Sequence, residues 1–216
     1  MGFVSLKQKQ KSMQEQLSES HNIRLHRALR WLERAEQEMD DDDAQFIFLW
    51  IAFNAAYADE FGNENAERTN LNNFFATLTK ADKKDRIYQL LFQSFTGEIR
   101  TLIENKFVFQ PFWKALREHD SSESWKTRFE ASKKAAMAKL LEHDTVAVLS
   151  IIFDRLYILR NQLIHGGATW NSSVNRNQVS DGTKIMAKLV PLMVDIMIDS
   201  PDQDFGALIY PVIPSQ

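Results

Sequence analysis

The chain has 216 residues, a length that suits one domain and allows a sizeable hydrophobic core. Its formal net charge of -3 excludes an overall basic footprint, so any nucleic-acid contact must come from a local patch. The absence of cysteine excludes disulfide bonds, a thiolate nucleophile and a cysteine-ligated metal. We expect a cytoplasmic protein with no membrane span, because the N-terminus is rich in lysine and glutamine and the most apolar stretch, residues 44–58, is short and interrupted by polar side chains.

Long helices are the main expectation, because only 7 glycines and 5 prolines interrupt the chain. A first helix is predicted from a cap at Ser18 or Ser20 to about Gln37. Its apolar stripe consists of Leu25, Ala28, Leu29, Leu32 and Ala35. The same helix carries a basic stripe, which is either a track for RNA phosphates or a solvated charged face beside nearby glutamates. This stripe consists of Arg24, Arg27, Arg30 and Arg34.

A second helix, residues 44–61, follows an acidic turn and is apolar nearly all round, so it should be central. Residues 62–143 are predicted to form an insertion of shorter helices, at about 71–79, 83–105, 111–119 and 124–141. Two further core helices are predicted over residues 144–165 and 181–198, with Gly166 stopping the first and Pro191 kinking the second. An extended tail, residues 199–216, should dock through Leu208, Ile209, Tyr210 and Val212.

These elements predict a single all-α domain. Its core is a four-helix up-and-down bundle built from residues 18–61 and 144–198, with the helical insertion between core helices 2 and 3.

One arginine interrupts the apolar pattern of the third core helix. At about 100° per residue, Arg160 falls inside the arc formed by Leu149, Ile152, Phe153, Leu156, Leu159 and Leu163. Burying an unpaired guanidinium costs several kcal/mol. We therefore expect a partner for Arg160, which could be a buried carboxylate such as Asp154 or Asp59, a second subunit or an anionic substrate.

The other side of this helix carries Asp154, Asn161 and His165 beside a second apolar edge, Ile151 and Ile158. This edge indicates contact with another subunit or with the insertion. Arg160 and His165 are about 140° apart on an ideal helix, so one copy does not readily aim both side chains at one atom. Two copies facing each other across a twofold axis could do so.

An arginine and a histidine supply what RNA self-cleavage needs. Histidine transfers protons near neutral pH, and a guanidinium neutralises a phosphate through paired donors. In such a reaction a 2′-hydroxyl is deprotonated, the crowded phosphorane is stabilised and the departing 5′-oxygen is protonated. It requires no metal ion and no cofactor.

The stretch from Leu156 to Trp170, which contains Arg160-Asn161-Gln162-Leu163-Ile164-His165-Gly166-Gly167, resembles the HEPN (higher eukaryotes and prokaryotes nucleotide-binding) superfamily. The mark of that superfamily is an arginine, usually followed by a polar residue, and a histidine four to six residues after the arginine. Residues 48–57 resemble the second helix of its ApeA-like branch. The resemblance covers about half the chain, and the insertion lies outside it.

The resemblance implies a metal-independent endoribonuclease whose site is completed by dimerisation and whose product ends in a 2′,3′-cyclic phosphate. Arg160 would hold the phosphate, His165 would transfer protons, and Asn161 would orient the substrate or the histidine. The implied setting is phage defence or a toxin with a neutralising protein partner. The superfamily also contains inactive members, so a non-catalytic module that binds a nucleotide, RNA or a protein is the alternative, followed by a structural dimer.

Three other features have two interpretations each. Trp170, just past the motif, could stack on a base or pack over the helix end. Glu118-His119-Asp120 and Glu142-His143-Asp144 contain a histidine–aspartate pair that can bind metal. Each triplet, however, lies at a helix boundary, where histidine suits the end of one helix and aspartate the cap of the next. We therefore predict no metal site.

Overall fold

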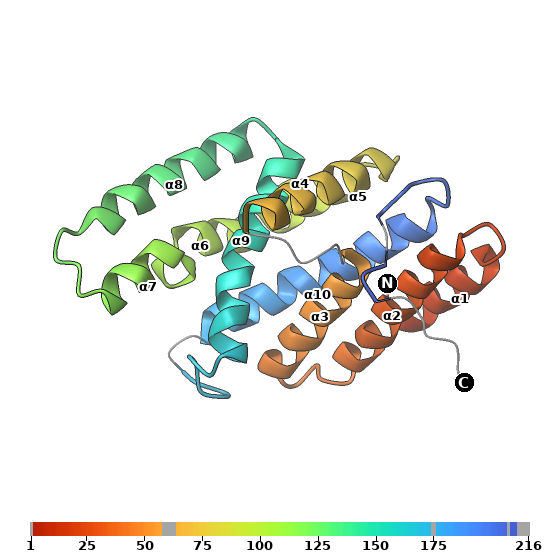
Figure 1. The fold of residues 1–216 in the computed structure, drawn as a ribbon, viewed down its shortest axis with the longest axis horizontal. Coiled ribbons are helices and arrows are strands. Elements are labelled where there is room, and N and C mark those ends of the chain that lie inside the picture. Colours follow the sequence, from red (N-terminus) through yellow and green to blue (C-terminus); the bar gives the residue numbers. More distant parts are fainter. Residues whose placement is uncertain (1, 58–63, 174–175, 207, 211–216) are drawn as a thin grey trace.

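A computed structural model of the chain describes residues 2–57, 64–173, 176–206 and 208–210. Within these residues the secondary structure is entirely helical, which confirms the all-α class (Figure 1). The elements in chain order are α1 (Phe3–Met13), α2 (Glu19–Glu36), α3 (Asp42–Tyr57), α4 (Glu64–Ala81), α5 (Arg86–Gln89), the π-helical segment η1 (Leu90–Ser94), α6 (Thr96–Glu104), the 3₁₀ segment η2 (Lys106–Val108), α7 (Gln110–Arg117), α8 (Ser124–Leu141), α9 (Thr145–Ile164) and α10 (Arg176–Ile198).

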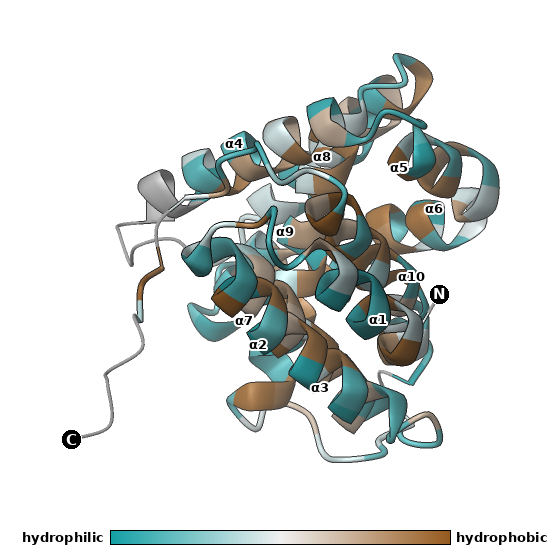
Figure 2. Ribbon diagram, turned by 90° about the vertical axis from the view of Figure 1, so that its right-hand side faces the viewer, coloured by the Kyte–Doolittle hydropathy of each residue, from teal (hydrophilic) through white to brown (hydrophobic). Residues whose placement is uncertain are grey.

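Helix α2 forms as its sequence predicts. The hydroxyl of Ser18 caps it by accepting the N–H of His21 at 3.2 Å. All five residues of the predicted apolar stripe are buried. Hydrophobic and hydrophilic bands alternate along most of the helices, as expected for elements that bury one face (Figure 2).

Helix α1 was not predicted, because it is rich in lysine and glutamine and buries only a narrow face. It buries Leu6 and Gln10 and packs against α2 and α10. A helix needs little apolar surface of its own when it lies on the outside of an existing core, so weak amphipathicity gave no signal here.

Helix α9 lies between two groups of helices. The predicted core helices do pack together, α2 with α3 and α10, and α9 with α3 and α10. On its other side α9 contacts α4, α6 and α8 of the insertion, so the insertion covers the core instead of standing apart from it (Figure 1). The predicted bounds of this helix, residues 144–165, agree with α9 and its two cap residues.

Three predicted boundaries are wrong. Helix α4 begins at Glu64, seven residues before the start predicted at about residue 71. Helix α10 begins at Arg176, earlier than the predicted Asp181, and Val179 in its first turns is fully buried. The helix predicted over residues 83–105 is divided into α5, η1 and α6. The π-helical segment arises where the N–H of Phe95 donates to the carbonyl of Leu90, five residues earlier, at 3.1 Å. Periodicity alone does not reveal such a division, because the apolar residues continue across it.

The tail docks differently from the prediction. Phe205 packs edge-on against His21 and Phe74, with ring centroids 5.3 and 6.1 Å apart. Leu208 and Ile209 are half-buried, Tyr210 is exposed and Val212 lies outside the described residues. The tail is therefore anchored through Phe205, earlier in the chain than expected.

Candidate functional site

The end of α9 is closed by backbone hydrogen bonds that fix the predicted motif. His165 is the C-cap residue, and its N–H donates to the carbonyl of Asn161 at 3.1 Å. Gly166 follows with a φ of 68°, the left-handed conformation that glycine adopts readily. The N–H of Ala168 then donates to the carbonyl of Gln162 at 3.0 Å, which turns the chain back over the last turn. The glycine stop was predicted correctly, and it leaves the His165 side chain exposed.

Arg160 is half-buried, so the prediction of a position fully inside the core is wrong in degree. Its Nη1 donates to Oδ1 of Asn161 at 2.8 Å, while its Nε is buried without a hydrogen-bond partner. No ion pair joins Arg160 to a carboxylate within the described residues. Of the two carboxylates considered as partners, Asp154 pairs with Arg68 instead, and Asp59 lies outside the described residues. The guanidinium therefore keeps donor capacity toward an anion.

The loop after the motif is tied to the start of α3. Asp43 is buried and accepts hydrogen bonds from Nη1 of Arg176 at 2.7 Å and from the N–H of Asn171 at 3.1 Å. Trp170 is 70% exposed, and its Nε1 donates to Asp41 at 2.8 Å. This exposure disfavours the interpretation that Trp170 packs over the helix end. The indole is held by one edge and its ring is accessible.

The basic stripe of α2 is not a continuous surface. Arg24 is only 2% exposed, and its guanidinium donates to the carbonyls of Ala56 and Gly206, each at 2.9 Å. It joins α2, the end of α3 and the tail, so its predicted role in substrate binding is wrong. Arg27 is half-buried, and Arg30 is exposed and paired with Glu33 one turn away. The arrangement favours a solvated charged face over a phosphate track.

Arg155, and not Arg160, is the fully buried arginine of α9. It is 4% exposed and donates to the carbonyl of Val108 at 3.2 Å and to the hydroxyl of Ser132 at 3.0 Å. Its guanidinium also lies over the rings of Phe109 and Phe129. Burial lowers the pKa of Arg155 to about 10, so the side chain is still charged at neutral pH. The aromatic partners come from the insertion, and for this reason the wheel could not identify them.

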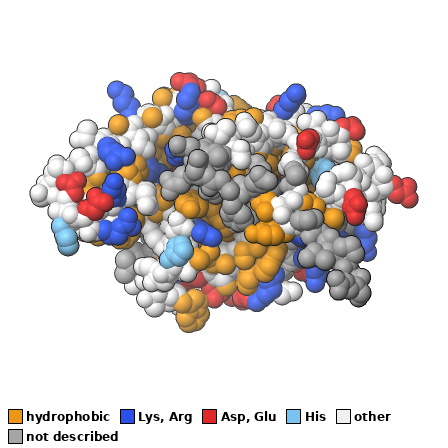
Figure 3. Space-filling view, in the orientation of Figure 1, with side chains coloured by type: hydrophobic (Ala, Val, Ile, Leu, Met, Phe, Trp, Pro, Cys, Tyr) orange, Lys and Arg blue, Asp and Glu red, His pale blue; other side chains and the backbone are white. Residues whose placement is uncertain are grey.

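Apolar side chains stand exposed on the face of α9 that carries Arg160. Tyr157 and Ile164, one turn before and one turn after Arg160, are both exposed. Tyr157 lies beside Trp50 of α3, with ring centroids 6.2 Å apart. Hydrophobic side chains also gather over α3 in the middle of the face drawn in Figure 3. The motif therefore borders an apolar surface.

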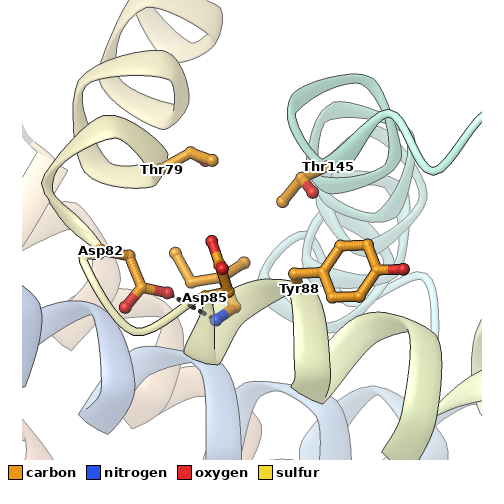
Figure 4. Close-up of a pocket in the computed structure, with 6 residues that line it drawn as sticks. Thr79, Asp82, Asp85, Tyr88 and Thr145 are labelled. Atoms are coloured by element: carbon orange, nitrogen blue, oxygen red, sulfur yellow. Dashed lines mark hydrogen bonds between the residues drawn. The ribbon is translucent and has the colours of Figure 1, made fainter.

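A small cavity beside α5 does not suit a phosphate. It has a volume of about 220 Å³ and lies between the end of α4, α5 and the start of α9 (Figure 4). Asp82 and Asp85 line it, and both would repel an anion. The carboxylate of Asp82 already accepts the N–H of Ile87 at 2.7 Å and Nε of Arg86 at 3.2 Å. These two hydrogen bonds join Asp82 to the start of α5.

Of the two histidine–aspartate triplets, Glu142-His143-Asp144 fits the helix-boundary interpretation in full. The other, Glu118-His119-Asp120, fits it only at its histidine, because the N-cap residue of α8 is Glu123. His119 and His143 both have positive φ, near 52° and 54°, just after α7 and α8. Asp144 caps α9 by accepting the N–H of Ala147 at 3.1 Å. Within the described residues there is no cluster of three or more histidine, aspartate or glutamate side chains that could hold a metal ion.

Comparison of the chain with protein-family models, with curated proteins and with solved structures finds no match. Among the described residues, no helix has both the length and the apolar character to cross a lipid bilayer.

Proposed function

We propose that this protein is a metal-independent endoribonuclease of the HEPN type, with a four-helix bundle of that type as its core. The observation that carries the proposal is the state of Arg160. It is a permanently charged, half-buried guanidinium with a buried Nε that has no partner, and no carboxylate pairs with it in the described part of the chain. A phosphodiester would supply the missing acceptors.

The reaction needs one base and one acid. A neutral His165 imidazole accepts the proton of an RNA 2′-hydroxyl, and the 2′-oxygen then forms a bond to the adjacent phosphorus. The bond from phosphorus to the 5′-oxygen breaks, and a second, protonated histidine gives its proton to that oxygen. The products are a 2′,3′-cyclic phosphate and a free 5′-hydroxyl. Arg160 neutralises the charge that develops on the phosphate oxygens, and Asn161 orients the guanidinium through its 2.8 Å contact.

A second copy of the chain would provide the second histidine. Arg160 and His165 diverge around the helix, so a twofold pairing of α9 ends would bring the Arg160 of one copy toward the His165 of the other. The exposed side chains of Tyr157 and Ile164 give that contact an apolar surface to bury. Ile164→Glu should therefore yield a monomer in sedimentation and lose cleavage at the same time. A native protein that stays monomeric at micromolar concentration would rule out the shared site.

The decisive test is cleavage of mixed RNA in EDTA. We expect cyclic-phosphate ends from the native protein, and a loss of about a hundredfold or more in rate from His165→Ala and from Arg160→Ala. His26→Ala and Arg100→Ala are matched controls, because both residues are exposed and lie on other helices. Equal cleavage by all five proteins would show that the motif is not the nuclease. RNA binding without cleavage would favour the non-catalytic module.

A further inference from the structure

The part of the insertion that contains α7 and α8 is basic, although the chain as a whole is acidic. Residues 106–141 contain eight lysines and arginines against four aspartates and glutamates, whereas the whole chain has 26 against 29. Figure 3 shows Lys and Arg side chains over the end of the molecule that α7 and α8 form. Arg117 and Arg128 are exposed and make no ion pair within the described residues. Four lysines of this region pair with nearby glutamates, so Arg117 and Arg128 are among the cations that can contact a polyanion.

A row of aromatic rings runs through this basic region. Phe107 in η2, Phe112 in α7 and Trp125 in α8 follow one another edge to face, with ring centroids 5.5 and 5.0 Å apart. The ammonium group of Lys106 lies 5.2 Å from the ring centroid of Phe107 and 5.5 Å from that of Phe112. Phe107 is 39% exposed although it is an apolar side chain. We call Phe107, Phe112 and Trp125, together with Lys106, the aromatic row.

One end of the aromatic row opens into a small cavity. The cavity has a volume of about 170 Å³, and Phe112, Trp125, Leu116, His119 and Asp120 are among the residues that line it. That volume is below the roughly 300–1,000 Å³ of a drug-sized ligand site. Two aromatic side chains in the lining suit the flat face of a single base. The carboxylate of Asp120, which already accepts the N–H of Ser122 at 2.8 Å, can also accept a hydrogen bond from the amino group of a base.

The other end of the aromatic row reaches the predicted catalytic motif. The side-chain amide of Gln162 donates to the carbonyl of Phe107 at 2.7 Å. Gln162 lies one turn before His165 on α9, so its side of the helix adjoins that of the histidine. Arg155 makes a second contact between α9 and η2 by donating to the carbonyl of Val108, the residue after Phe107. The backbone of Phe107 thus lies against the last turn of α9, which leads to His165.

We propose that the aromatic row and its cavity bind single-stranded RNA and lead it to the end of α9. Successive bases stack on Phe107 and Phe112, one unstacked base enters the cavity against Trp125, and Lys106 and Arg117 contact the phosphates. A duplex would not expose its base faces to these rings, so the aromatic row selects single strands. This inference rests on the proposed function, because it identifies the surface that would hold the same substrate.

Binding is measured with fluorescently labelled single-stranded RNA and the full chain carrying His165→Ala, which prevents cleavage. Adding Phe107→Ala should weaken binding about tenfold, the effect expected from the loss of one stacking platform. Trp31→Ala is the matched control, since Trp31 is an aromatic residue of α2 with nearly the same exposure, 38%, and should leave affinity unchanged. Lys106→Gln and Arg117→Gln, both surface changes, should each reduce the slope of affinity against salt by about 0.7.

Cleavage separates this inference from the proposed function. In the otherwise native protein, Phe107→Ala should raise KM for single-stranded RNA and change kcat little, because the ring binds the strand and takes no part in proton transfer. Unchanged binding of long RNA by Phe107→Ala, Lys106→Gln and Arg117→Gln would overturn the inference, whether or not His165 and Arg160 prove to be catalytic. Binding that depends on these residues without any cleavage would support RNA binding by the aromatic row and count against the proposed nuclease activity. Failure of the parent protein to bind RNA would overturn both.

Discussion

Gly182 in α10 should be intolerant of even one additional methyl group. A Cβ placed on this residue would lie 3.0 Å from Leu159, 3.1 Å from Leu156 and 3.2 Å from Phe46, all of them fully buried. These contacts are shorter than the ordinary separation of about 3.5–4.0 Å between carbon atoms. At Gly182, α10 therefore packs closely against both α9 and α3, next to the turn of α9 that precedes Arg160.

The expected effect of Gly182→Ala is the difference of two terms. Alanine stabilises a helix interior by about 0.5–1 kcal/mol relative to glycine, whereas overpacking a tight core costs about 1–3 kcal/mol. Because three buried side chains must move together, we expect a net loss of about 1 kcal/mol in the free energy of unfolding. The assay is urea unfolding followed by circular dichroism, with Gly97→Ala in α6 as the control. A Cβ at Gly97 would meet nothing within 4 Å, so that change should be neutral or slightly stabilising. If Gly182→Ala proved as stable as Gly97→Ala, the close approach of the three helices would be refuted.

Two further predictions concern buried titratable groups. Arg155→Ala should lower the free energy of unfolding by about 3 kcal/mol, because it removes two hydrogen bonds from a charged donor and two ring contacts; Arg100→Ala, an exposed arginine, should change it by less than about 0.5 kcal/mol in the same urea assay. Burial, aided by the charge of Arg24, lowers the pKa of His21 below its ordinary value of 6.5. The unfolded chain then binds this proton at a higher pH than the folded chain, so stability should fall as the pH drops below 6.5. His21→Phe should flatten that decline in thermal unfolding, and an equally steep decline in the variant would show that His21 is not responsible.

The sequence located most of the core because the core follows local rules. The predicted stripe of α2 is buried in full, and Ser18 caps that helix as its position indicated. The end of α9 was found from Gly166, since few residues other than glycine adopt positive φ there at little cost. These features depend on residues a few positions apart, so the amino-acid sequence alone is enough to predict them.

The roles of the arginines could not be read from the sequence in the same way. A helical wheel marked Arg160 as the buried cation, yet Arg155 occupies the interior because Phe109 and Phe129 of the insertion surround it. Arg24 was counted with an exposed stripe, but the carbonyls of Ala56 and Gly206 hold it inside the protein. In each case the partner lies far away along the chain.

The sequence by itself therefore determined the helical class, the main buried faces and the motif at the end of α9. Tertiary structure alone decided which cations are buried, where the tail docks, and that the aromatic residues around Phe107 come to lie beside that motif. The physical reason is that apolar periodicity reports which face of a helix is buried, but not which distant segment covers it. A buried polar group needs hydrogen-bond partners, and here those partners lie on that distant segment.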